Sequence, residues 1–292
     1  MGALALTRAS MFAASGCVAT AQDAVVSTNE TITGRALANE RLVLLTNEPA
    51  LVTIDLAART SARTPLTRAG RGSGLWGLGE AAGTLYSISE FVDLVRLGED
   101  GTVHPAARFP QAIGNLIDTR EGMATQHAVG EPGAPLAWLT DASAALSAIE
   151  GPARQALGLS RAEEGVLHLL SCSIPPRVVC WLPGSNQLLS FDGRRLAAAV
   201  PLETVARIAP ARLLASPESR AIRDAVATEG GTFVVLYGLS EGSDRRALAE
   251  FGADGRRLRT LQPSAPIRLL LKAGRGVLHA IDRNGRLAEV PL

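Results

Sequence analysis

The chain has 292 residues, a net charge of +1, 47% hydrophobic residues and 20% charged residues. Because it is nearly neutral and has no basic run, it lacks the positive surface that nucleic acids or acidic lipids attract, and no nucleic-acid partner is expected. Aromatic residues make up only 4% of the chain, so the core should consist mainly of Leu, Val, Ile and Ala. The length fits two ordinary domains or one large all-β domain.

The first 21 residues have the features of an export signal. Arg8 supplies a positive charge, residues 9–19 are mostly small and apolar, and the sequence Ala-Thr-Ala at 19–21 fits a cleavage site. We therefore predict a leader over residues 1–21 and a mature domain over residues 22–292. Export would place the protein in the periplasm or at the outer membrane. If the segment is instead a disordered N-terminus, the protein is cytoplasmic.

Cys17 offers a second interpretation of the same segment. Ala14-Ser15-Gly16-Cys17 resembles a bacterial lipobox, with alanine where leucine is usual. In that case Cys17 would be lipidated and would become the mature N-terminus. Such an anchor would be the only contact with a membrane, because no run of about 18 apolar residues that could form a spanning helix follows.

Short apolar runs separated by turn residues recur along the chain. Residues 267–292 contain three such runs, and Arg283-Asn284-Gly285 separates the second from the third. Asn-Gly between two apolar runs is a strong hairpin signal, because both residues accept positive φ. Related turns lie near residues 57, 100, 141, 192, 254 and 284, at uneven intervals centred on about 40 to 50 residues. Short strands at this period predict a β-propeller, in which each sheet depends on its neighbours.

The predicted fold is thus all-β, with six blades of four antiparallel strands, although five or seven blades remain alternatives. The blades are expected at residues 33–68, 70–109, 111–150, 157–202, 220–263 and 265–292. The last stretch has room for only three strands, so an N-terminal strand should complete that blade. Pairing of the N- and C-terminal strands would close the ring and remove an open sheet edge.

Cys172 and Cys180 flank Pro175-Pro176, which should form a turn between two apolar runs. Both cysteines are four residues from Pro176, and we expect them to face each other across the hairpin. They could form a disulfide in an oxidising compartment, or they could simply be two small buried side chains. A zinc site is not expected, because no C-x-x-C pair accompanies them.

Motifs with a defined chemistry are scarce. Residues 72–77, GSGLWG, match G-x-G-x-x-G, but the surrounding sequence predicts a hairpin and not the strand and helix of a dinucleotide site. These glycines are expected to let an inner strand pack close to the propeller axis. The three tryptophans, Trp76, Trp138 and Trp181, are interpreted as packing residues. The charged groups at 118–121 and 161–164 are expected to be solvated loop tips, with an axial site as the alternative.

Three segments carry a resemblance to a known class of protein: LLSFDGRRLAAAV, ALAEFGADGRRLRTL and LHAIDRNGRLAEVPL. Their pattern resembles the six-bladed, NHL-type propellers found among bacterial envelope lipoproteins. The resemblance implies a monomeric binding or scaffold module without a cofactor, with a protein, peptide or glycan as its ligand. A structural spacer without a ligand pocket is a further interpretation.

A related set of six-bladed propellers, the gluconolactonase and regucalcin-like hydrolases, implies a competing function. These enzymes hold a divalent metal at the axis with Glu, Asn and Asp ligands, so a metal-dependent hydrolase or lactonase that uses calcium is the alternative. Asn115 and Asn186 are the asparagines considered for that role, and neither fits the pattern. Convergence of three acidic or amide side chains at the axis would favour the enzyme.

Overall fold

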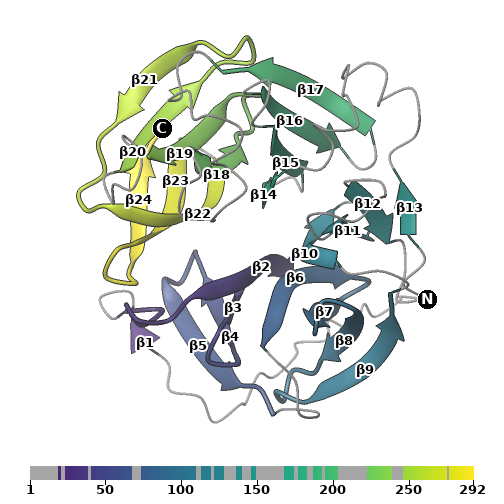
Figure 1. The fold of residues 1–292 in the computed structure, drawn as a ribbon. Coiled ribbons are helices and arrows are strands. Elements are labelled where there is room, and N and C mark those ends of the chain that lie inside the picture. The colour runs from purple at the N-terminus through teal and green to yellow at the C-terminus, as the bar shows by residue number, and fades with distance from the viewer. Residues whose placement is uncertain are drawn as a thin grey trace, which may run out of the picture.

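The structure is a computed structural model, and every regular element in its described residues is a β-strand (Figure 1). It describes residues 19–20, 24–38, 41–67, 74–109, 113–119, 122–127, 136–139, 146–148, 168–173, 177–182, 187–192, 195–202, 222–238, 246–274 and 276–292. Across these ranges, no helix is long and apolar enough to cross a membrane.

The strands form six antiparallel sheets, numbered here in chain order. The first contains, in spatial order, β1 (Ala19–Thr20), β5 (Thr60–Pro65), β4 (Ala50–Asp55), β3 (Arg41–Thr46) and β2 (Ile32–Ala38). The second contains β6 (Leu75–Ala81), β7 (Thr84–Ser89), β8 (Asp93–Leu97) and β9 (Val103–Arg108). The third contains β10 (Ile113–Thr119), β11 (Gly122–His127), β12 (Leu136–Leu139) and β13 (Leu146–Ala148).

In the remaining sheets the spatial order of the strands is their order in the chain. The fourth contains β14 (His168–Ser173), β15 (Arg177–Leu182), β16 (Gln187–Asp192) and β17 (Arg195–Pro201). The fifth contains β18 (Ile222–Ala227), β19 (Phe233–Gly238), β20 (Arg246–Phe251) and β21 (Arg257–Leu261). The sixth contains only β22 (Ile267–Gly274), β23 (Val277–Asp282) and β24 (Leu287–Pro291).

The sheets lie around a ring, with β2, β6, β10, β14, β18 and β22 toward the middle and the later strands of each sheet toward the outside (Figure 1). This arrangement confirms the predicted propeller of antiparallel sheets, and each predicted blade stretch forms one sheet. The predicted count of six four-stranded blades differs from the described residues, where five sheets have four strands or more and the sixth has three. Among the described strands the predicted pairing of N- and C-terminal strands is not observed either, and β1 pairs with β5 at the outer edge of the first sheet.

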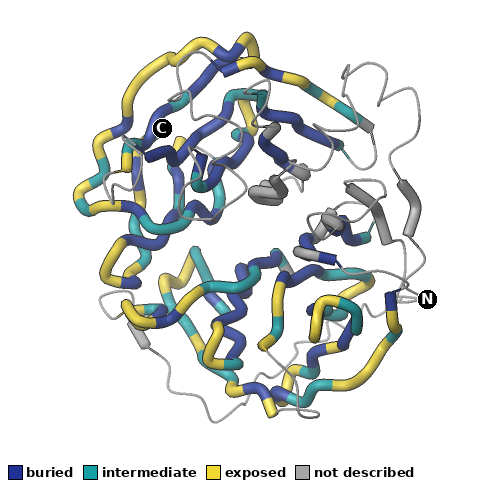
Figure 2. Tube along the Cα trace, in the orientation of Figure 1, coloured by how far each residue is buried: buried dark blue, intermediate teal, exposed yellow. Residues whose placement is uncertain are grey.

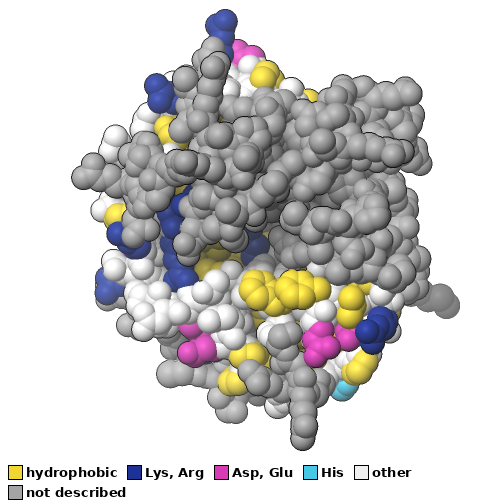
Figure 3. All heavy atoms as spheres, viewed as in Figure 1, with side chains coloured by type: hydrophobic (Ala, Val, Ile, Leu, Met, Phe, Trp, Pro, Cys, Tyr) yellow, Lys and Arg dark blue, Asp and Glu magenta, His cyan; other side chains and the backbone are white. Residues whose placement is uncertain are grey.

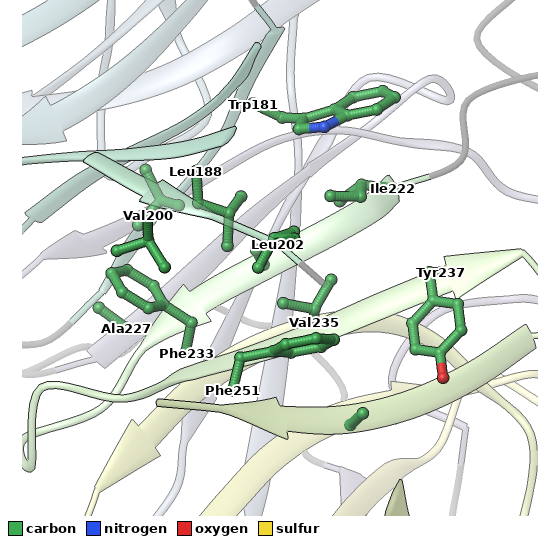
Figure 4. Close-up of a cluster of buried hydrophobic side chains, with 13 residues drawn as sticks. Trp181, Leu188, Val200, Leu202, Ile222, Ala227, Phe233, Val235, Tyr237 and Phe251 are labelled. Atoms are coloured by element: carbon green, nitrogen blue, oxygen red, sulfur yellow. The ribbon is translucent and has the colours of Figure 1, made fainter. Parts of the chain in front are cut away.

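Most of the hydrophobic core lies between neighbouring sheets, and buried residues follow the strands (Figure 2). Between the first and second sheets the core is aliphatic, as predicted. Between the fourth and fifth sheets it also contains aromatic side chains, including Trp181, Phe233 and Phe251 (Figure 4). Burying each large side chain contributes about 1.5–3 kcal/mol, so the contacts between sheets are a major source of stability.

Glycine turns precede the last strand of the second, fifth and sixth sheets. Gly101, Gly255 and Gly285 have φ of 85°, 80° and 76°, a left-handed conformation that glycine adopts without strain. All three follow Asp or Asn, which confirms the predicted Asp-Gly and Asn-Gly turns. A Cβ on Gly285 would lie 1.7 Å from the Val26 carbonyl oxygen, so no side chain fits there.

The N-terminal segment closes the ring through Val26. The backbone N–H groups of Val25 and Val26 donate hydrogen bonds to the Gly285 carbonyl, at 2.8 and 3.1 Å. In the first two sheets the residue just after the outer strand, Leu66 or Phe109, donates in the same way to the turn between the two middle strands. Val26 is buried, and it occupies in the sixth sheet the position that Leu66 and Phe109 occupy in theirs.

The same junction buries apolar side chains from both ends of the chain. Val26 packs in a cluster with the first-sheet residues Leu42, Leu44, Val52 and Ile54 and with Leu271 and Ile281 of the sixth sheet. Residues near the two ends of the chain are therefore in contact, as predicted. The contact involves a buried side chain and a turn, whereas a strand ladder was expected.

Candidate functional site

Several predicted residues lie outside the described part of the structure. These are Cys17 with most of the 1–21 segment, Asn186, and the group at 161–164. Asn115 and Asp118 lie on β10, the inner strand of the third sheet, but only their backbone is described. Their proposed roles remain predictions.

Cys172 and Cys180 lie on neighbouring strands, β14 and β15, but not opposite each other. Cys172 pairs with Val178, and Cys180 pairs with Leu169. The predicted register is therefore wrong, because the strand partner of Cys172 lies two residues before Cys180. Residues offset diagonally in this way lie about 7–8 Å apart, beyond the usual range of disulfide Cα separations. Cys180 has a free, buried thiol, and its burial raises the pKa of that thiol.

The glycine-rich motif at 72–77 continues into β6, a strand, so its described part has no helix N-terminus that could hold a phosphate. A Cβ on Gly34 of β2 would lie 2.6 Å from the backbone of Gly77. The two inner strands thus approach each other closely at this pair of glycines. This agrees with the prediction that the glycines allow tight packing near the axis.

A buried ion pair connects three inner strands. The guanidinium of Arg35, on β2, donates to both carboxylate oxygens of Asp224, on β18, at 2.7 and 2.6 Å. Between them lies β22, whose Leu270 carbonyl accepts from Arg35 and whose Leu270 N–H donates to Asp224 at 2.9 Å. The pair therefore fastens the first and fifth sheets across the inner strand of the three-stranded sixth sheet.

The hydrogen bonds to Arg35 occupy the carboxylate of Asp224. Both of its oxygens accept hydrogen bonds from Arg35, and the Ala225 N–H adds another at 3.0 Å. Across the described ranges, no group of three or more His, Cys, Asp or Glu side chains is placed to hold a metal ion. The carboxylate is thus used to close the ring.

A small pocket lies beside the ion pair. It is lined by Arg35, Ala36, Leu37, Leu42, Leu56, Leu271 and Lys272. Its cavity measures about 10 Å³, which is room for about one water molecule. The pocket is too small for a ligand of metabolite size.

The most exposed aromatic side chains in the described structure form a pair on the second sheet. Trp76 of β6 is 40% exposed, and Phe91 in the turn between β7 and β8 is 43% exposed. Their rings stack with centroids 6.0 Å apart and an interplanar angle of 21°. On the face drawn in Figure 3, hydrophobic and acidic side chains are exposed side by side over this sheet. We call Trp76 and Phe91 the aromatic platform.

The turn that holds Phe91 has an unusual backbone. Glu90 and Phe91 have φ of 52° and 62°, and a hydrogen bond from the Val92 N–H to the Ser89 carbonyl spans them at 3.2 Å. Two positive φ values define a turn that normally has Asn and Gly at these positions. Left-handed backbone costs a residue with a Cβ roughly 1–2 kcal/mol. Strain of this kind is often concentrated at functional sites.

Hydrogen bonds hold the strained turn in place. The Phe109 N–H donates to the Val92 carbonyl at 2.7 Å, and the Ile113 N–H donates to the Phe91 carbonyl at 2.8 Å. Near Trp76, the Ser87 hydroxyl donates to the Gly77 carbonyl at 2.8 Å. Hydrogen bonds therefore hold the backbone on both sides of the aromatic platform, at the turn that carries Phe91 and at the strand that carries Trp76.

Sequence reasoning did not find this site. It assigned Trp76 to blade packing, which is correct for the buried Trp181 and wrong for the exposed Trp76. The available signal was Ser89-Glu90-Phe91-Val92, a turn between two apolar runs that lacks both Asn and Gly. Such a turn predicts a strained backbone, which the positive φ values of Glu90 and Phe91 show.

No protein-family model and no curated protein sequence matches the chain. Among solved structures, a gluconolactonase from Xanthomonas campestris is similar at 14% identity and a TM-score of 0.53, covering 95% of this chain and 90% of that chain. A luciferin-regenerating enzyme is similar at 11% identity and a TM-score of 0.52, covering 94% of each chain. The virginiamycin B lyase of Staphylococcus aureus is similar at 10% identity and a TM-score of 0.50, covering 95% of this chain and 88% of that chain.

The chain is a β-propeller. At such low identity the similarity concerns the fold alone, because one propeller scaffold can carry unrelated activities. The function of this propeller has to be inferred from its own residues.

Proposed function

We propose that this propeller is a non-enzymatic binding module of the bacterial cell envelope that holds a protein or peptide ligand on the aromatic platform. The exposed stack of Trp76 on Phe91 is the observation that carries the proposal. Aromatic side chains dominate the energetics of binding surfaces, because they bury a large area while losing little conformational entropy.

The local backbone supports this proposal. A bulky aromatic residue in a left-handed turn costs backbone strain that glycine would avoid. The platform is also rigid, because hydrogen bonds anchor the turn beneath Phe91. A rigid platform loses less conformational entropy when a ligand binds.

Capture from the native envelope tests the proposal. Wild-type protein carrying a photo-crosslinking residue beside the platform is compared with a Trp76→Ala/Phe91→Ala variant. Leu258→Ala is the matched control, because Leu258 on β21 is 57% exposed and lies on a different sheet. We expect a crosslinked partner that wild type and the control retain and the double variant loses. Equal retention by all three proteins would reject the proposal, and a crosslinked glycan would reject the protein or peptide ligand.

The envelope location is a separate part of the proposal and rests on the leader pattern of residues 1–21. Mass spectrometry of the mature N-terminus distinguishes the two processing routes. A lipidated Cys17 indicates an anchored protein, and Gln22 indicates a freely exported one. An intact N-terminus would place the protein in the cytoplasm.

A further inference from the structure

We propose that the group recognised by the aromatic platform is a cationic side chain of the partner, arginine ahead of lysine, with Glu90 as its counter-ion. This inference rests on the proposed binding function and specifies its ligand.

The rings provide the first half of the site. The face of an aromatic ring carries partial negative charge and attracts cations, most strongly when the ring is tryptophan. Trp76 and Phe91 stack close to parallel and both side chains are exposed, so ring surface remains open to a ligand. A guanidinium is planar and weakly hydrated, and it can stack on such a surface while its N–H groups stay free to donate.

Glu90 provides the second half. It is exposed and directly precedes Phe91, and its carboxylate forms no ion pair or hydrogen bond with any described residue. The nearby Asp93 differs, because it lies 3.8 Å from the guanidinium of Arg108. Among these two acids beside the platform, Glu90 is therefore the one whose oxygens remain available to an incoming cation.

The turn links the two halves. Glu90 and Phe91 are its consecutive central residues, and both have positive φ. Asn-Gly at these positions would relieve the strain but would remove both the carboxylate and one of the rings. The strained turn thus presents an anion and an aromatic face together, which is the combination that binds arginine.

The test uses three blocked tripeptides as probes: Gly-Arg-Gly, Gly-Lys-Gly and Gly-citrulline-Gly. Citrulline keeps the shape of arginine and removes its charge. Binding is followed by NMR through the indole N–H signal of Trp76, which is assigned as the signal that Trp76→Phe removes. We expect the arginine peptide to bind with a dissociation constant about tenfold lower than the citrulline peptide, with the lysine peptide between them.

Two variants check the counter-ion. Glu90→Gln should raise the dissociation constant of the arginine peptide about fivefold and reduce its dependence on salt. Glu99→Gln is the matched control, because Glu99 is an exposed carboxylate in another turn of the same sheet, and it should change nothing. Both changes are at exposed sites, so neither should affect folding.

The possible outcomes distinguish failure of the cationic ligand from failure of the platform as a binding site. Equal binding of the arginine and citrulline peptides would overturn the cationic ligand while leaving a platform that binds uncharged groups. An unchanged affinity in Glu90→Gln would remove Glu90 from the site. If the arginine peptide binds Phe91→Ala as tightly as wild type, the platform is not the binding site and both proposals fail.

Discussion

Arg35 and Asp224 are 189 residues apart in the sequence, and their side chains form a two-bond ion pair at the inner strands of the propeller. Both are buried, and the pair spans the sixth sheet, which in the described residues has three strands, fewer than any other sheet. At this three-stranded sheet the ring is therefore closed by the Arg35–Asp224 ion pair on the inner strands and by the packing of Val26 farther out.

Breaking this pair should be costly, because one charge would be left buried without a partner. We expect Arg35→Met or Asp224→Leu to lower the free energy of unfolding by about 3–5 kcal/mol. Replacing both residues, Arg35→Met with Asp224→Leu, should cost less than either single change. Urea unfolding of the four proteins measures the coupling. Additive effects of the two single changes would mean that the pair does not act as a unit.

Gly285 should be intolerant of any side chain, because of both its backbone conformation and the proximity of Val26. Gly285→Ala is compared with Gly231→Ala, which has a similar φ of 79° and open space where its Cβ would lie. The control should cost about 1 kcal/mol for the left-handed backbone alone. Gly285→Ala should cost at least about 2 kcal/mol more, since Val26 must move out of the junction. Equal losses in urea unfolding would show that Val26 does not seal the ring.

Glu30 should make stability depend on acid pH. Burial raises the pKa of its carboxyl, but hydrogen bonds from Arg63 and the Ser27 N–H, with the charge of Arg63, outweigh burial and hold the pKa below its ordinary value of 4.5. A carboxyl with a lowered folded-state pKa stabilises the fold above its unfolded pKa and loses that contribution as pH falls through the folded pKa. Between about pH 5 and 3, wild type should therefore lose more stability than Glu30→Gln. Parallel losses in thermal unfolding would contradict this role.

Cys180 should be inert in the native protein. Its thiol is buried, and burial raises the pKa, so the reactive thiolate does not form near neutral pH. Alkylation followed by peptide mass spectrometry should leave Cys180 unlabelled in buffer and fully labelled in guanidinium chloride. If the Cys172–Cys180 disulfide exists in the exported protein, Cys180 stays unlabelled in guanidinium until a reductant is added. The register of β14 and β15 argues against that result.

Much of the fold could be predicted because its signals are local. Asp100-Gly101, Asp254-Gly255 and Asn284-Gly285 form turns as their sequence requires, and the spacing of such turns locates the sheets. Closure of the ring could not be predicted in detail. Whether Val26 enters a core or a strand ladder depends on contacts with residues more than 250 positions away, and local patterns do not encode these.

The candidate site was missed for a different physical reason. A tryptophan in an apolar run usually packs inside, and Trp181 does so. Trp76 lies at the beginning of its strand, and its ring stacks on Phe91 instead of entering the core between sheets. Only the three-dimensional structure shows that the two exposed rings stack and that Glu90, the residue before Phe91, is exposed and makes no ion pair with a described residue.

The central claim is that the turn at Glu90 and Phe91 accepts strain in order to bind a ligand, and one pair of variants tests it most directly. Glu90→Asn/Phe91→Gly supplies the preferred turn, and Ala82→Asn, whose φ is 51°, makes the same kind of change before Gly83 at the other end of the sheet. We expect both variants to raise the free energy of unfolding, the first by about 1 kcal/mol after loss of the ring stack. Binding of the arginine peptide should be abolished in the first and unchanged in the second. A Glu90→Asn/Phe91→Gly variant that is less stable than wild type, or that binds the peptide as well, would contradict the account.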